Sequence, residues 1–231
     1  MECVTSSLKV KERPRLPGTG RLEAYSDGVF AIVATLLVLE LKVPHLEVVT
    51  PDGLWLAVRA LWPKFFSFAV SFFIVTIFWV NHHHFCHRIT HSDWKLMWLN
   101  SLLLFWLTVL PFTTAFLGDY PDQPLVIGLY AMTLCLASLS FTAMGYYVFF
   151  KSELIEPWIS QAHREKEWRR SMFAALAFGL TALVAAVSVP TALVLLGLLP
   201  LFYVIPGALQ QTPPFGAEGW EGETPAGAVA E

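Results

Sequence analysis

Six long apolar segments, separated by short polar connections, constrain the fold of this chain more than any other feature. A helix that crosses a bilayer core needs about 20 predominantly apolar residues. No water in the bilayer core can satisfy free backbone groups, so uncharged segments of this length are expected to be helical. The sequence therefore predicts an all-α membrane protein with six transmembrane helices. They are Leu22–Val43, Leu54–Val80, Leu96–Leu117, Leu125–Phe150, Ser171–Val189 and Thr191–Leu209.

The composition agrees with a membrane protein and excludes other classes. Only 14% of the 231 residues are charged, whereas a soluble domain carries roughly a quarter. The net charge of −3 is too small to indicate a nucleic-acid partner. Cys3, Cys86 and Cys135 lie far apart, so we expect neither a disulfide framework nor a thiolate metal site. The lipid bilayer is the expected partner, and no cofactor is expected.

The basic residues predict how the chain is oriented. Of the fifteen Lys and Arg residues, twelve fall in residues 1–21 and in the connections after the second and fourth spans. The positive-inside rule therefore places both termini in the cytoplasm. This predicts a cytoplasmic segment over residues 1–21, a six-helix transmembrane domain over residues 22–209, and a tail over residues 210–231. That tail is rich in Pro, Gly, Ala and Glu, and we expect it to be disordered.

The first span differs from the others because it combines ionisable residues with an evenly spaced apolar stripe. Ionisable groups at membrane depth are costly and usually face a protein interior or an aqueous pathway. Ile32, Leu36 and Leu39 have the spacing of one helix face, and Val29 and Tyr25 continue it toward the N-terminus. Spacing alone leaves two interpretations open: the stripe packs against helices or lipid, or it lines a pore.

Four sequence motifs carry a resemblance to a known family. The first is Arg-x-x-x-Tyr-Ser-Asp at residues 21–27, followed by Gly-Val-Phe-Ala-Ile. The others are Phe-Trp-Val-Asn-His-His at residues 78–83, Trp-Leu-Asn-Ser-Leu-Leu at 98–103 and Leu-Pro-Phe-Thr-Thr-Ala at 110–115. Together they resemble the transmembrane protein 175 family, which comprises endolysosomal potassium channels and their six-span bacterial relatives.

The resemblance implies a passive potassium channel in which four copies of the chain place the first span around a central pore. Ile32, Leu36 and Leu39 would then form stacked apolar rings, with Ile32 at the narrowest point, and Thr35 would offer a hydroxyl beside them. A ring of branched aliphatic side chains can close a pore by dewetting. Tyr25 stands where the family has phenylalanine. The six-span count favours the bacterial inner membrane as the location.

The polar residues of the first motif are predicted to orient this helix. Ser26 and Asp27 follow Arg21 by five and six residues, about 500° and 600° around the helix, so they do not stack with it. We therefore expect their partners on other helices. Four residues at similar depth are predicted to supply them. These are Trp79, Asn81, His83 and Asn100.

The histidine-rich stretch His82–His91 suggests a second function. His83, His87 and His91 would share one face if the helix continued through them, and imidazoles so placed can bind a divalent cation. The alternative is therefore a carrier for cations or metal. Only one acidic residue, Asp93, lies nearby, so we expect no bound metal. An enzyme is not expected, because a metal oxidase would need several separated histidine clusters.

Overall fold

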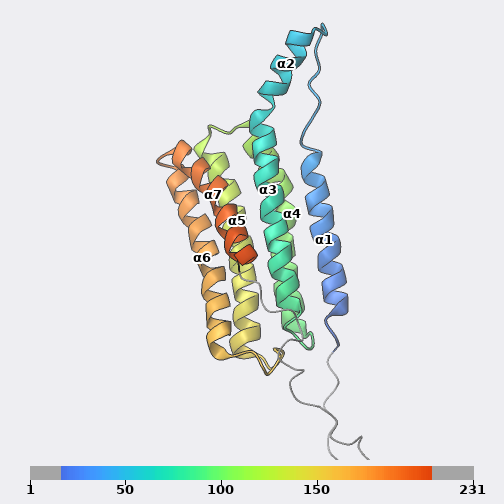
Figure 1. Cartoon of the computed structure of the whole chain (residues 1–231), viewed down its shortest axis with the longest axis vertical. Helices are drawn as coiled ribbons and strands as arrows, with labels where there is room; N and C mark the ends of the chain where they lie inside the picture. Colours follow the sequence, from blue (N-terminus) through green and yellow to red (C-terminus); the bar gives the residue numbers. More distant parts are fainter. Residues whose placement is uncertain (1–16, 210–231) are drawn as a thin grey trace, which may run out of the picture.

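The computed structural model describes residues 17–209, with side chains through Leu201. Over this range the chain forms seven α-helices and one π-helix (Figure 1). The helices are α1 (Gly20–Val38), α2 (Pro51–Ala60), α3 (Trp62–Cys86), α4 (Trp94–Asp119), α5 (Pro124–Tyr146), η1 (Tyr147–Lys151), α6 (Gln161–Ala185) and α7 (Val189–Leu209). Most of the predicted N-terminal segment (1–21) and the whole predicted tail (210–231) lie outside the described residues.

Helix α1 packs through one face against α3 and α4, on one side of the bundle (Figure 1). The buried face is formed by residues at helical spacing, namely Leu22, Ser26, Phe30, Val33 and Leu37. The helix ends five residues before the predicted Val43. Residues 39–43 instead form turns leading to Pro44, whose ring disfavours a helical conformation at the residue before it.

The predicted second span is wrong as a single helix, because the chain breaks at Leu61 into α2 and α3. Pro63 has no N–H to donate, and its ring would clash with a carbonyl one helical turn earlier. α2 buries none of its residues and projects beyond the bundle (Figure 1). α3 continues to Cys86, past the predicted end at Val80, and carries the polar motif residues with it.

Helices α4 and α5 form the centre of the core. The Asp93 carboxylate caps α4 by accepting from the Leu96 N–H at 2.8 Å. Near the other end of α4, Gly118 allows close approach to α3, since a Cβ there would lie 3.2 Å from the Lys64 Cα. A chain of hydroxyls links three helices: Tyr130 Oη donates to Ser71 Oγ, and Ser71 Oγ donates to Thr114 Oγ1, each at 2.8 Å.

Helices α6 and α7 form a helical hairpin, with the break at residues 186–188, close to the boundary between the last two predicted spans. α6 begins ten residues earlier than the predicted Ser171, because Ser160 provides an N-cap that accepts from the His163 N–H at 3.3 Å. The helix therefore starts in a charged segment, which the hydropathy-based prediction places outside the fifth span. Its first turns lie at the same end of the bundle as the start of α1 (Figure 1).

Over the residues whose side chains the structure describes, three helices have the length and hydropathy needed to cross a membrane. They are α3, α4 and α5 with its continuation η1. The chain is therefore a helical membrane protein, as predicted. The other predicted spans fall on α1, which carries Arg21, Glu23 and Asp27, on α6 and on α7.

Candidate functional site: the first helix and its polar contacts

A continuous chain of hydrogen bonds joins α1, α4 and α3 inside the bundle. Ser26 Oγ donates to the Leu22 carbonyl at 2.8 Å and accepts from Asn100 Nδ2 at 2.9 Å. The amide oxygen of Asn100 lies 2.8 Å from His82 Nε2. Because an amide oxygen only accepts, His82 carries its proton on Nε2, which leaves Nδ1 facing the Cys86 thiol at 3.6 Å. Ser26, Asn100 and His82 are all at most 2% exposed.

His82 is the member of this chain that the sequence did not identify. Three consecutive histidines follow Trp79-Val-Asn81, and the prediction assigned the polar contact to His83. The structure buries His82 instead, with its ring 5.5 Å from that of Phe30. His82 shares a face with the buried Val75, Phe78 and Phe85. That pattern was available in the sequence, but α3 is apolar on all sides and does not reveal which face is inward.

Asp27 and Trp79 form a second contact between α1 and α3, at the edge of the bundle. Trp79 Nε1 donates to Asp27 Oδ1 at 2.9 Å. The indole also stacks on His83 at 5.7 Å between ring centroids, and His83 meets the His87 ring edge-on at 4.4 Å. The structure therefore brings Ser26 and Asp27 together with Trp79, His83 and Asn100, on two adjoining sides of α1.

Two of the expected participants lie elsewhere. Asn81 accepts a hydrogen bond from Arg170 Nη2 at 2.5 Å, so it joins α3 to α6 rather than to α1. Arg21 is exposed and makes no hydrogen bond or ion pair with another residue in the described range 17–209.

The apolar stripe lies on the opposite face of α1 and is not covered by any of the residues that the structure describes. Tyr25 is 61% exposed, Ile32 59%, Leu36 42% and Leu39 66%. Val29 departs from the expected stripe, because it is partly buried against the core. Thr35 is exposed beside the stripe, and its hydroxyl donates to the backbone of its own helix, at 3.0 Å from the Ala31 carbonyl and 2.9 Å from that of Ile32.

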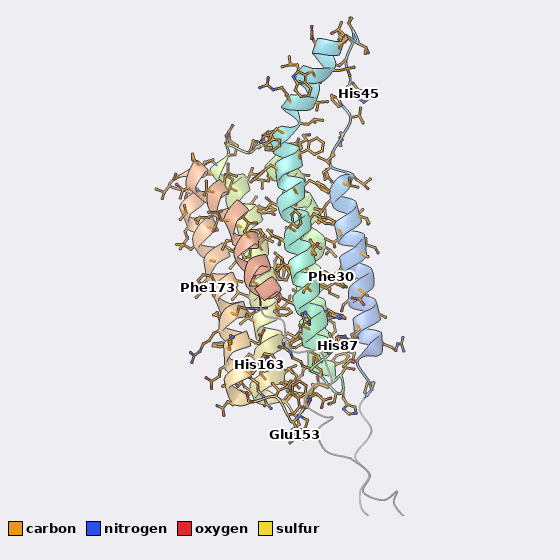
Figure 2. All side chains as sticks on the ribbon, viewed as in Figure 1. Phe30, His45, His87, Glu153, His163 and Phe173 are labelled. Carbon is orange, nitrogen blue, oxygen red and sulfur yellow. The ribbon has the colours of Figure 1, made fainter. Side chains whose placement is uncertain are left out.

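The histidine stretch does not have the geometry expected for a metal carrier. α3 ends at Cys86, His87 is its C-cap, and His91 lies in the following connection, so the three imidazoles do not share a continuous helix face. Figure 2 shows His87 at the end of the bundle. No group of three His, Cys, Asp or Glu side chains within residues 17–209 is placed to hold a metal ion.

These features define a helical membrane protein whose first helix is fixed by polar contacts on one side and leaves an apolar face uncovered on the other. Residues 21–111 match the model of the family described as "Endosomal/lysosomal potassium channel TMEM175". A Streptomyces collinus protein named potassium channel B446_29190 is 35% identical over 189 residues, covering 80% of this chain and 91% of that protein.

More distant relatives extend the comparison. The Gallus gallus protein named endosomal/lysosomal proton channel TMEM175 is 27% identical over 188 residues, which cover 79% of this chain and 37% of the relative. The crystal structure of a lysosomal potassium-selective channel TMEM175 homolog from Chamaesiphon minutus matches with a TM-score of 0.73 and 29% identity. That match covers 81% of this chain and 97% of the other.

The chain belongs to the TMEM175 family. The family resemblance drawn from the sequence motifs is therefore confirmed. Membership also identifies the chain as an ion-channel protein and not as an enzyme.

Proposed function

We propose that this chain forms a passive, potassium-permeable channel in which α1 lines the pore. The observation that carries the proposal is the division of α1 into two faces. One face is held by buried hydrogen bonds through Ser26, and the other exposes Ile32, Leu36 and Leu39. The permeant ion is supported by the family description and by the relative from Streptomyces collinus.

The uncovered face also supports a homotetramer. A single α1 cannot enclose a pathway, so several copies must place their stripes around one axis. Four copies would stack Ile32, Leu36 and Leu39 into apolar rings, of which the Ile32 ring would be the narrowest. Such rings exclude water when they are close together and readmit it when they separate slightly, which provides a hydrophobic gate.

The orientation and location follow from the charge distribution. With all six predicted spans crossing the bilayer, twelve of the fifteen basic residues lie on the side where α1 begins. Both termini would then be cytoplasmic, in the inner membrane of a bacterium. The short extension α2 would lie on the opposite side.

Cation flux into liposomes that contain the purified chain tests this function. Wild-type protein is expected to pass potassium in preference to sodium without an energy source, and Ile32→Ala is expected to raise the flux or reduce the preference. Leu180→Ala is the matched control, because Leu180 is also 59% exposed but lies on α6. It should behave as wild type.

The same assay separates the channel from the carrier. A carrier that uses the histidine stretch would lose transport in His83→Ala or His87→Ala and would be insensitive to Ile32→Ala. Absence of potassium flux from folded wild-type protein would also contradict the proposed channel function.

A further inference from the structure

A cavity of about 510 Å³ lies between α3 and the group formed by α5, α6 and α7, within the size range of about 300–1,000 Å³ of ordinary ligand pockets. Its walls come from these four helices, from η1 and from Arg88 just after α3. The residues that line it include none from α1 or α4, so it is separate from the pore-forming face proposed above. In the view of Figure 1, α3 and α6 lie on opposite sides of α5.

The lining changes from apolar to polar along the length of the cavity. Along the middle of the bundle it is formed by large apolar side chains, which include Phe73, Ile77, Phe141, Phe178 and Leu199. At the end where α3 stops and α6 starts, the lining is formed by charged and polar side chains. These are His84, Arg88, His163, Glu167 and Arg170. Figure 2 shows His163 at this end of the molecule, on the same level as His87.

The residues that line the polar end of the cavity include two guanidinium groups and one carboxylate. Arg88 Nη1 and Arg170 Nη2 each lie 3.8 Å from the same Glu167 Oε2, and Glu167 is the only acidic residue among those that line the cavity. Burial and the neighbouring Arg88 lower the pKa of His163 below its usual 6.5, so this imidazole is neutral at pH 7 and can donate or accept a hydrogen bond. Guanidinium groups form strong charge-assisted hydrogen bonds to phosphate.

Two buried polar atoms of the lining lack partners. Within the part of the chain that the structure describes, Ser138 Oγ and Trp168 Nε1 are the buried side-chain atoms without a hydrogen bond, and both residues line this cavity. Ser138 is 2% exposed. An unsatisfied buried donor costs about 1–3 kcal/mol, so these two residues make this wall of the bundle less stable than a fully hydrogen-bonded one.

We propose that this cavity binds one anionic phospholipid from the surrounding leaflet. Its phosphate would lie between Arg88 and Arg170, and an acyl chain would lie along Ile77 and Phe178. An amphipathic occupant is required because the cavity is apolar within the bundle and cationic at its end. Basic pockets between transmembrane helices recognise anionic lipid headgroups for the same reason. The proposal depends on membrane insertion and not on ion conduction.

Native mass spectrometry of the full-length chain tests the headgroup site. The protein is incubated with equal amounts of phosphatidylglycerol and phosphatidylcholine that carry the same acyl chains. Wild type is expected to retain phosphatidylglycerol preferentially, and Arg88→Gln and Arg170→Gln are each expected to lower its affinity roughly tenfold, as the loss of a charge-assisted hydrogen bond would. The matched control is Arg169→Gln, because the Arg169 side chain is 75% exposed and its residue does not line the cavity.

A second pair of variants tests the acyl-chain site. Ala174 lines the cavity, whereas Leu176 on the same helix is 65% exposed. Ala174→Trp is expected to fill the cavity and remove bound lipid, whereas Leu176→Trp should retain it. Thermal melting of each variant confirms that it is folded.

Three results would overturn the proposal. The first is equal retention of the two lipids by wild type. The second is unchanged lipid binding in both Arg88→Gln and Ala174→Trp. The third is a wild type that binds no lipid together with an Ala174→Trp variant that no longer forms oligomers. That result would indicate that a second copy of the chain occupies this surface.

Discussion

Helices α1 and α5 are both apolar, yet they are packed in opposite ways. α5 buries thirteen of its 23 residues and contacts α4, α6 and α7. α1 buries five of its 19 residues and packs mainly against α3 and α4. The largest side chains of its other face, such as Ile32, remain exposed.

The difference lies in which residues each helix presents to its neighbours. α5 carries small residues such as Ala131, Ala137 and Gly145, which allow helices to approach from several directions. α1 has large aliphatic residues on both faces, and Ser26, near its N-terminal end, is the polar residue of the inward one. We infer that α5 stabilises the subunit, whereas the second face of α1 is available for contacts between subunits or with the pore.

The largest expected effect is therefore on α5. Tyr130→Ala removes a fully buried ring and the hydroxyl bound to Ser71, and we expect it to lower the stability of the folded chain by about 3 kcal/mol. Leu129→Ala is the control on the same helix, since Leu129 is 42% exposed. Denaturation in detergent measures both. Equal stability of the two variants would contradict the inference that the buried side chains of α5 stabilise the subunit.

The next effect is at the inward face of α1. Asn100→Ala leaves His82 Nε2 and Ser26 Oγ without their partner in the core, which we expect to cost about 1–2 kcal/mol. The Ser101 hydroxyl donates only to the Met97 carbonyl of its own helix, so Ser101→Ala should change stability far less. The same denaturation assay compares them. A neutral Asn100→Ala would mean that α1 is positioned by apolar contacts alone.

Asp27 provides a smaller contribution to folding but a test of function. Asp27→Ala breaks the exposed hydrogen bond from Trp79 and is expected to cost about 0.5–1 kcal/mol while reducing assembly or current. Trp79→Phe removes the same bond from the other side and should reproduce the effect. Cross-linking and liposome flux are the measurements. Conductance like that of wild type in both variants would exclude an orienting role for this contact.

The smallest effect on folding is expected at the uncovered face. Thr35 bonds to the backbone of its own helix and is exposed, so Thr35→Ala should change stability by less than about 0.5 kcal/mol. If α1 lines the pore, the potassium-to-sodium flux ratio changes nonetheless. An unchanged ratio together with a large loss of stability would place Thr35 in a folding role.

The sequence predicted the membrane class, the presence of a helix at residues 22–38 and the family, because length, hydropathy and the motif at residues 21–27 are local properties. It also identified Ser26, Trp79 and Asn100 as contact residues. It missed the break of the second span at Leu61, because the apolar residues on both sides of Pro63 made Leu54–Val80 read as one helix. It missed His82 because choosing among three adjacent histidines requires the rotation of α3, which only packing determines.

The position of the polar contacts along α1 has a mechanical consequence. Among the described residues, the hydrogen bonds from α1 to other helices are made at Ser26 and Asp27, near its N-terminal end, whereas Val33 and Leu37 are held by apolar packing. α1 would therefore tilt about a pivot near its N-terminal end, at Ser26. With a rise of 1.5 Å per residue, Leu39 lies about 20 Å from the pivot and Ile32 about 9 Å. A tilt of about 5° would displace Leu39 by about 1.7 Å but Ile32 by only about 0.8 Å. Ile32, which lies nearer the pivot, would therefore move less than Leu39 in the same tilt.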